Sequence, residues 1–215
     1  MALRIAFDLD GVLADMDVEL SRLTGELFGI GDDEGKLDVS QERQLWRHIE
    51  GVENFWEGLQ ELEEGAVRRL ARIAEERRWQ ILFITTRPAT AGATVQVQSQ
   101  RWLQSKGFAL PSVFVVYGSR GKVASALNLD AVVDDRLDNC LDVIADSTAR
   151  PLLFISAGSR QSGRSAGAQR LGIPIVQTLS ECLELLTKLE TPEPDNAGII
   201  ARVMRTLGLG DPAKQ

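Results

Sequence analysis

Cysteine and histidine are scarce in this chain of 215 residues, which contains two Cys and one His. Cys140 and Cys182 show no metal-motif spacing, so we expect neither a disulfide framework nor a zinc site. This cysteine usage fits a reducing compartment, and we expect a cytoplasmic location. A histidine-based mechanism would depend on His48, which lies far from any predicted strand end and is expected at the surface.

The chain also lacks an excess of positive charge and any long hydrophobic run. Its formal net charge of -7 argues against wholesale binding to nucleic acid or to an anionic membrane. No apolar stretch approaches the length of a membrane span, and the N-terminus has no signal-like segment. We therefore expect a globular protein that acts on a small substrate, with homodimer formation left open.

Apolar strand-like stretches alternate with amphipathic ones along most of the chain. The predicted buried strands cover residues 3–7, 79–86, 112–117, 130–133 and 151–156, with 173–176 as a sixth candidate. The predicted helices cover residues 64–78, 94–106, 122–127, 137–145 and 180–189. This alternation predicts an α/β fold with a doubly wound parallel sheet in three layers.

One segment interrupts the alternation directly after the first strand. Residues 16–62 contain no convincing strand and have a helical pattern, which predicts an inserted helical cap. The core would then consist of residues 1–15 and 63–190. Residues 191–215 would form a proline-bearing acidic linker, a short helix over 199–207 and a frayed end.

Polar side chains follow the predicted strands at the points where they end. In chain order they are Asp8 and Asp10, then Thr85, Thr86 and Arg87, then Arg120 and Lys122, and finally Asp134 and Asp135. Because the carboxyl ends of parallel strands share one edge of the sheet, we expect these groups to meet there. Two acids at the end of a buried strand are costly to desolvate, so they indicate a bound cation, a reaction, or both.

The residue types indicate a particular chemistry. Carboxylates from two strands favour Mg²⁺ over zinc, because Mg²⁺ prefers oxygen ligands. A cation, the Lys122 ammonium and threonine hydroxyls together suit a phosphoryl group. One carboxylate can attack phosphorus while a second serves as acid and then as base.

Four motifs in order resemble those of the haloacid dehalogenase (HAD) superfamily of phosphohydrolases. They are Asp8-Leu9-Asp10-Gly11-Val12, Thr85-Thr86, Lys122 and Asp134-Asp135, and the resemblance covers roughly residues 3 to 180. It implies strand order 3-2-1-4-5 with a small cap after strand 1. It also implies a phosphatase that hydrolyses phosphomonoesters through an aspartyl-phosphate and uses Mg²⁺.

The resemblance also implies roles for individual residues. Asp8 would be the nucleophile and a metal ligand, and Asp10 the acid/base that offers its backbone carbonyl to the metal. Thr85 or Thr86 would bind phosphate, Lys122 would steady the nucleophile and the phosphoryl group, and Asp135, with or without Asp134, would complete the metal site. Arg87 would contact phosphate or base, or pair with a surface acid. Arg120 and Arg136 are expected to be solvated or structural.

Shorter sequence segments resemble those of the 5'(3')-deoxyribonucleotidase group, and this resemblance implies a nucleoside monophosphate substrate. These segments are DLDGVLAD, FITTRP, QRWL, VVDDR and, near the end of the cap, NFWEGL. Three alternatives stay open: a sugar phosphate, a polynucleotide 3'-phosphate, or a non-catalytic protein that binds a phospho-ligand on the same fold.

Further residues have two interpretations each. Trp46, Phe55 and Trp56 would form a small core of the cap, or else stack on a substrate. Asp15 would anchor the cap hinge, or be a solvated acid at a helix start. The Gly/Ser-rich stretch 156–167, with Arg160 and Arg164, would be a substrate loop or a plain connection.

Overall fold

The structure is a computed structural model that describes residues 2–30, 37–156 and 162–189. Six parallel strands form one sheet in the order β3-β2-β1-β4-β5-β6. The strands are β1 (Arg4–Asp8), β2 (Gln80–Thr85), β3 (Ser112–Val115), β4 (Ala131–Asp134), β5 (Arg150–Phe154) and β6 (Ile175–Val176). The predicted α/β fold and strand order are confirmed, and the sixth candidate strand is present.

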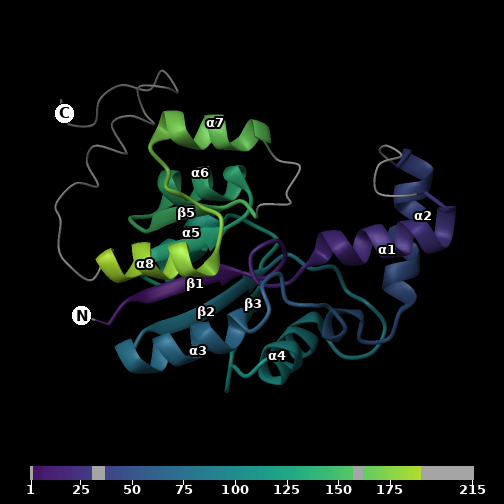
Figure 1. The fold of residues 1–215 in the computed structure, drawn as a ribbon, viewed down its shortest axis with the longest axis horizontal. Coiled ribbons are helices and arrows are strands. Elements are labelled where there is room, and N and C mark those ends of the chain that lie inside the picture. The colour runs from purple at the N-terminus through teal and green to yellow at the C-terminus, as the bar shows by residue number, and fades with distance from the viewer. Residues whose placement is uncertain (1, 31–36, 157–161, 190–215) are drawn as a thin grey trace.

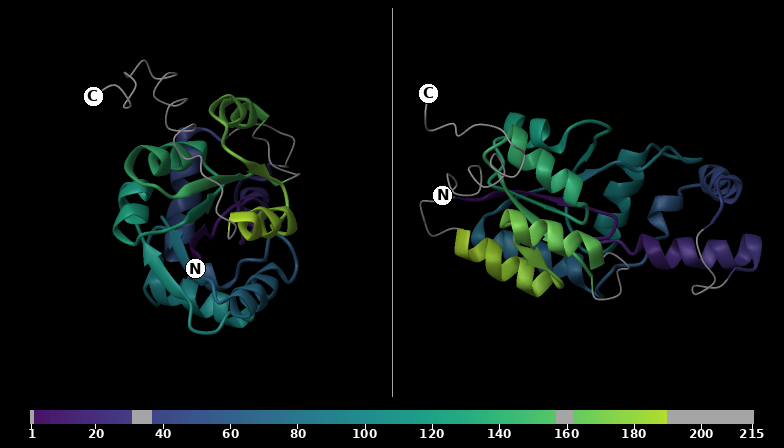
Figure 2. Two further views of the ribbon diagram at one scale, coloured as in Figure 1. Left: turned by 90° about the vertical axis from the view of Figure 1, so that its left-hand side faces the viewer. Right: turned by 90° about the horizontal axis from the view of Figure 1, so that it is seen from above.

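Helices cover both faces of this sheet (Figures 1 and 2). They are α3 (Ala66–Arg77), α4 (Val95–Ser105), α5 (Arg120–Ala126), α6 (Leu137–Asp146), α7 (Ser162–Leu171) and α8 (Leu179–Leu189). Side chains alternate across β1: Ile5 and Phe7 belong to the same core as α3 and α8, whereas Ala6 packs with α5 and α6. A strand buried on both faces must be apolar throughout, which explains the continuous run that predicted it. Among the described residues, no helix combines the length and apolarity needed to span a membrane.

The predicted helical insertion after β1 is present. It contains α1 (Met16–Phe28), α2 (Val39–Gly51) and the short η1 (Phe55–Glu57). Figure 1 shows α1 and α2 beyond the carboxyl end of β1, apart from the helices that flank the sheet. We call α1 and α2 the cap helices.

The chain enters and leaves the insertion along two adjacent antiparallel segments. The Asp15 N–H donates to the Gln60 carbonyl at 2.9 Å, and the Leu62 N–H donates to the Leu13 carbonyl at 2.8 Å. The Asp15 carboxylate also accepts from the Val18 N–H and so begins α1. Asp15 is therefore an acid at a helix start that also lies where the chain enters the insertion, and both interpretations of it stay open.

Two predicted boundaries differ from the structure. α5 begins at Arg120 rather than at Lys122, because the Ser119 hydroxyl accepts from the Lys122 N–H and caps the helix one residue before Arg120. α7 occupies the second half of the stretch 156–167, which was predicted as a loop or connection. Residues 157–161, with Arg160, and the tail 190–215, with its predicted helix, lie outside the described residues, as does the Arg164 side chain.

Gly121 is the point of closest approach between α5 and α6. A Cβ atom there would lie only 2.1 Å from the Asp142 carbonyl oxygen. We expect Gly121→Ala to destabilise the protein by about 1 to 3 kcal/mol, because the backbone of α6 must move to admit the methyl group. Gly118→Ala is the matched control, since nothing lies within 4 Å of its added Cβ. Urea unfolding with equal midpoints for the two variants would contradict this prediction.

Candidate functional site

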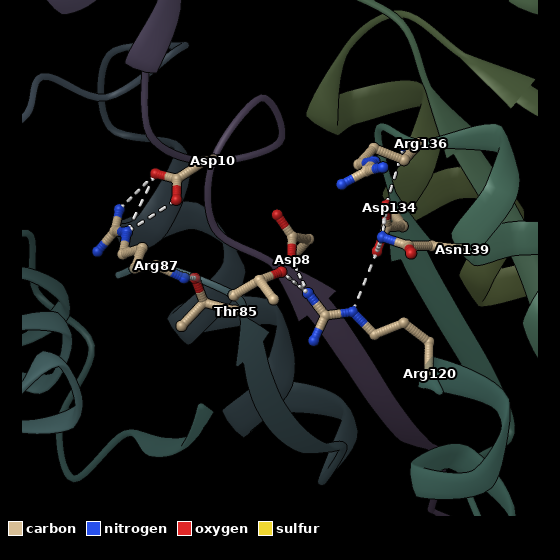
Figure 3. Close-up of polar contacts among 9 residues, drawn as sticks. Asp8, Asp10, Thr85, Arg87, Arg120, Asp134, Arg136 and Asn139 are labelled. Carbon is tan, nitrogen blue, oxygen red and sulfur yellow. Dashed lines mark hydrogen bonds and ion pairs between the residues drawn. The ribbon is translucent and has the colours of Figure 1, made fainter. Parts of the chain in front are cut away.

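A pocket of about 750 Å³ opens at the carboxyl edge of the sheet, between β1, β2, β4 and the cap helices. Six of the eight side chains predicted for the site line it, namely Asp8, Asp10, Thr85, Thr86, Arg87 and Asp135. Figure 3 shows how most of the polar groups here lie relative to one another. The remaining two, Lys122 and Asp134, are placed differently from the prediction.

Asp8 ends β1 and is buried at the centre of the site. Its Oδ1 atom accepts a hydrogen bond from Arg120 Nη2 at 2.9 Å. Burial and the nearby Asp134 carboxylate raise the pKa of Asp8 well above its usual range, and the Arg120 guanidinium offsets only part of this rise. Asp10 and Asp135 raise it further. The site therefore carries more negative charge than its own basic side chains neutralise.

Arg120, and not Lys122, is the cation beside Asp8. The Arg120 side chain is only 3% exposed, donates to Thr86 Oγ1 at 3.0 Å and lies 3.7 Å from Asp134 Oδ2. Lys122 is exposed, and α5 does not bring it to this group. Of the two expectations for Arg120, solvated or structural, the solvated one does not hold, because the helix starts earlier than its apolar pattern indicates and buries the side chain. Ser119 as an N-cap was the available signal, since it places Arg120 in the first helical turn.

The two threonines at the end of β2 have different surroundings. Thr85 is 1% exposed, and its hydroxyl accepts from the Arg87 N–H at 3.3 Å, which shapes the turn after β2. Thr86 is exposed, and its hydroxyl shares Arg120 Nη2 with Asp8. Of the two, Thr86 is therefore the better placed to meet a ligand next to Asp8.

The two acids at the end of β4, Asp134 and Asp135, also have different surroundings. Both carboxylate oxygens of Asp134 accept from Asn139 Nδ2 at 2.9 Å, and Oδ1 also accepts from the Arg136 N–H. Burial raises the pKa of Asp134, and these donors oppose that rise. Asp135 instead lines the pocket and lies against Gly11, where a Cβ atom would come within 2.7 Å of Asp135 Oδ2. Gly11 has φ +79°, so glycine is favoured there on both grounds.

The oxygen donors around Asp8 fit Mg²⁺ chemically. Among the described residues, no three His, Cys, Asp or Glu side chains are grouped to hold a metal ion. Asp8 at the end of β1 and Asp135, which follows β4, both line the pocket, whereas Asp134 at the end of β4 accepts from Asn139. Mg²⁺ commonly binds one or two carboxylates and keeps several waters, and a cation would relieve the crowding of acids around Asp8. Asp134 as a direct ligand beside Asp135 stays a prediction.

The Arg87 guanidinium is paired with an acid and is not directed at a phosphate group. The guanidinium lies on the Asp10 carboxylate, with Nη2 at 2.7 Å from Oδ1 (Figure 3). Of the interpretations for Arg87, pairing with an acid is therefore the one that the geometry matches, although the acid is Asp10 in the pocket rather than one on the surface.

The aromatic residues of the insertion differ in how far they are buried. Trp56 and Phe55 are buried, as a core interpretation predicts. Trp46 on α2 is 36% exposed and lines the pocket together with Met16 and Leu20 of α1. His48 is exposed, as expected. Cys140 and Cys182 are both free and buried, and burial raises the pKa of each thiol, so neither favours the reactive thiolate form.

Solved structures of HAD-type proteins share this fold. A protein assigned as a β-phosphoglucomutase from Thermotoga maritima superposes with a TM-score of 0.55 and 20% identity, over 86% of this chain and 99% of the other. A haloacid dehalogenase-like hydrolase from Streptococcus pneumoniae gives 0.54 and 13%, over 86% and 98%. A D,D-heptose 1,7-bisphosphate phosphatase from Burkholderia thailandensis gives 0.52 and 14%, over 86% and 98%.

These similarities establish a HAD-like fold at low sequence identity. No protein-family model matches the sequence, and no curated protein matches it either. The activity of this chain must therefore be argued from its own site.

Proposed function

We propose that this protein is a Mg²⁺-dependent phosphomonoester hydrolase that works through an aspartyl-phosphate on Asp8. One observation carries the proposal: a buried carboxylate, Asp8, is held by Arg120 beside the Thr86 hydroxyl, while Asp10 and Asp135 line the same pocket. Nucleophile, cation, hydroxyl and acid are the parts that phosphoryl transfer requires. The HAD-like fold of solved phosphatases supports the same conclusion.

In the first step, an oxygen of Asp8 attacks phosphorus and the bond from phosphorus to the leaving oxygen breaks. Asp10 gives a proton to that oxygen. The Thr86 hydroxyl would donate a hydrogen bond to a phosphoryl oxygen, and the Arg120 guanidinium beside it would offset the charge that shifts onto the phosphoryl group.

In the second step, Asp10 takes a proton from water, which attacks phosphorus and releases phosphate and the Asp8 carboxylate. When bound, Mg²⁺ held by Asp8, Asp135 and, as the resemblance implies, the Asp10 carbonyl would neutralise the acids and polarise the phosphoryl group.

For the substrate we propose a nucleoside monophosphate. The pocket is large enough for such a ligand at about 750 Å³. Trp46, Met16 and Leu20 supply an apolar part of the lining on the cap helices, beside the acids Asp17 and Glu42. An exposed indole can stack on a base.

The proposal is tested first on a generic aryl phosphate, with Mg²⁺ and then with EDTA. We expect turnover that EDTA abolishes and added Mg²⁺ restores, because without a cation the acids around Asp8 repel a phosphate dianion. A panel of UMP, dCMP, dTMP, a sugar phosphate and a 3'-phosphorylated oligonucleotide then ranks substrates. Beryllofluoride binding without turnover on any of them would instead indicate the non-catalytic alternative.

A pair of variants on α2 tests the nucleotide part of the proposal. Trp46→Ala should raise KM for the best nucleotide by about 10-fold, the loss expected for one base–aromatic stack. His48→Ala is the matched control, because it is exposed on the same helix and does not line the pocket. Equal KM values for the two variants would contradict stacking on Trp46, while the aryl phosphatase activity would remain independent evidence for the reaction.

A further inference from the structure

Arg87 and Asp10 form an ion pair in which the guanidinium contacts both carboxylate oxygens. Arg87 Nε lies 3.1 and 2.9 Å from the two Asp10 carboxylate oxygens, and Nη2 lies 2.7 Å from Oδ1. Two adjacent guanidinium nitrogens thus face both oxygens, which fixes the plane of the carboxylate as well as its position.

The same guanidinium is held from its other side. Nη1 donates to Ser99 Oγ at 3.0 Å, and the guanidinium carbon lies 4.8 Å from the Trp56 ring centroid and 5.8 Å from that of Trp102. The Arg87 side chain is 0% exposed. All three nitrogens are therefore engaged within the protein, and Arg87 offers none of them to a substrate phosphate.

The two tryptophans are themselves fixed by hydrogen bonds. Trp56 Nε1 donates to the Pro88 carbonyl at 3.0 Å, and Trp102 Nε1 donates to the Leu59 carbonyl at 2.7 Å. These bonds join the end of the insertion, the loop after β2 and helix α4. The place of the guanidinium is thus determined by three segments of the chain, and not by Asp10 alone.

From this geometry we propose that Arg87 is a positioning residue that holds the Asp10 carboxylate for proton transfer to the leaving oxygen. The inference rests on the proposed function, in which Asp10 is the acid/base. Proton transfer requires the carboxyl group within hydrogen-bond reach of the leaving oxygen, so a mobile Asp10 would transfer the proton slowly. A lysine cannot reproduce the two-nitrogen contact, because its ammonium is a single point charge.

The test compares substrates that need a proton on the leaving oxygen with one that does not. Dinitrophenolate leaves readily as an anion, whereas an alkoxide such as a nucleoside oxygen must be protonated. For Arg87→Lys, kcat/KM should fall by about 10- to 100-fold on an alkyl or nucleoside monophosphate and by less than about 3-fold on dinitrophenyl phosphate. The control, Arg101→Lys, alters an exposed arginine of α4 that pairs with Glu57 instead of Asp10, and it should stay within about 3-fold of wild type on both.

Arg87→Gln is measured beside Arg87→Lys, so that a folding defect in one variant does not decide the outcome. An equal loss on all substrates, or no loss, would overturn the inference. A rise in KM on every substrate with unchanged kcat would also overturn it and make Arg87 a phosphate ligand. Failure of the proposed function is distinct, because the wild-type protein would then not hydrolyse dinitrophenyl phosphate at all.

Discussion

Asp8→Asn abolishes phosphatase activity, with kcat on an aryl phosphate reduced by about 10⁴-fold or more. The amide cannot attack phosphorus, and Asp8 is the carboxylate that shares Arg120 Nη2 with the Thr86 hydroxyl. Steady-state assays with Mg²⁺ measure the loss. Asp138→Asn, at an exposed acid in the first turn of α6, is the control and should keep full activity.

The loss is not expected to reflect unfolding. The folded-state pKa of Asp8 is raised, so its contribution to stability is present below the unfolded pKa and lost as pH rises through the folded pKa. At neutral or higher pH the metal-free wild-type protein therefore carries a penalty that the neutral amide lacks. Urea unfolding without metal at pH 8 should show Asp8→Asn to be at least as stable as wild type. Lower stability together with residual turnover would contradict both parts of this prediction.

Arg120→Met lowers kcat/KM by about 10²- to 10³-fold, while Lys122→Met leaves it within about 3-fold. Arg120 contacts Asp8 and Thr86 directly, whereas Lys122 is exposed. The same assays on one aryl phosphate measure both variants. The opposite ranking, with a large effect only at Lys122, would restore the role first predicted for the lysine.

The Arg120 experiment needs a stability control, because Arg120 also lies between two buried acids. Removing Arg120 takes the cation away from both acids, a loss that commonly destabilises a protein by about 3 to 5 kcal/mol. Asp8→Asn differs, because it leaves Arg120 beside the Asp134 carboxylate. Arg120→Lys keeps the charge and should retain more stability and more activity than Arg120→Met. Activity is therefore assayed at a temperature below the thermal unfolding midpoint of each variant, so that a lower kcat/KM reflects the altered site and not unfolded protein.

The sequence predicted the parts of this protein that follow from a repeating pattern. Buried parallel strands such as β1 must be apolar on both faces, so their runs are visible, and their order follows once the family resemblance is accepted. Asp8, Asp10 and Asp135 reach the pocket because they lie at or just beyond the carboxyl ends of β1 and β4.

The sequence did not determine the position of a side chain where that position depends on the start of a helix or on a distant partner. Arg120 and Lys122 are two residues apart, and only the Ser119 cap decides which of them faces the strand ends. Asp134 accepts from Asn139, and Arg87 pairs with Asp10. The local spacing of these residues in the sequence does not encode either contact. The sequence does not distinguish the tandem threonines for the same reason, since they differ in burial and in their arginine partners.

The central claim is that a phosphoryl group becomes covalently bound to Asp8 during turnover. The most direct measurement is mass spectrometry of protein quenched in acid during hydrolysis of an aryl phosphate, with the modified residue located by peptide fragmentation. The account predicts one phosphoryl group on Asp8, more of it in Asp10→Asn because water attack is slowed, and none in Asp8→Asn. Rapid turnover with no modified Asp8 in either the wild-type or the Asp10→Asn protein would contradict it.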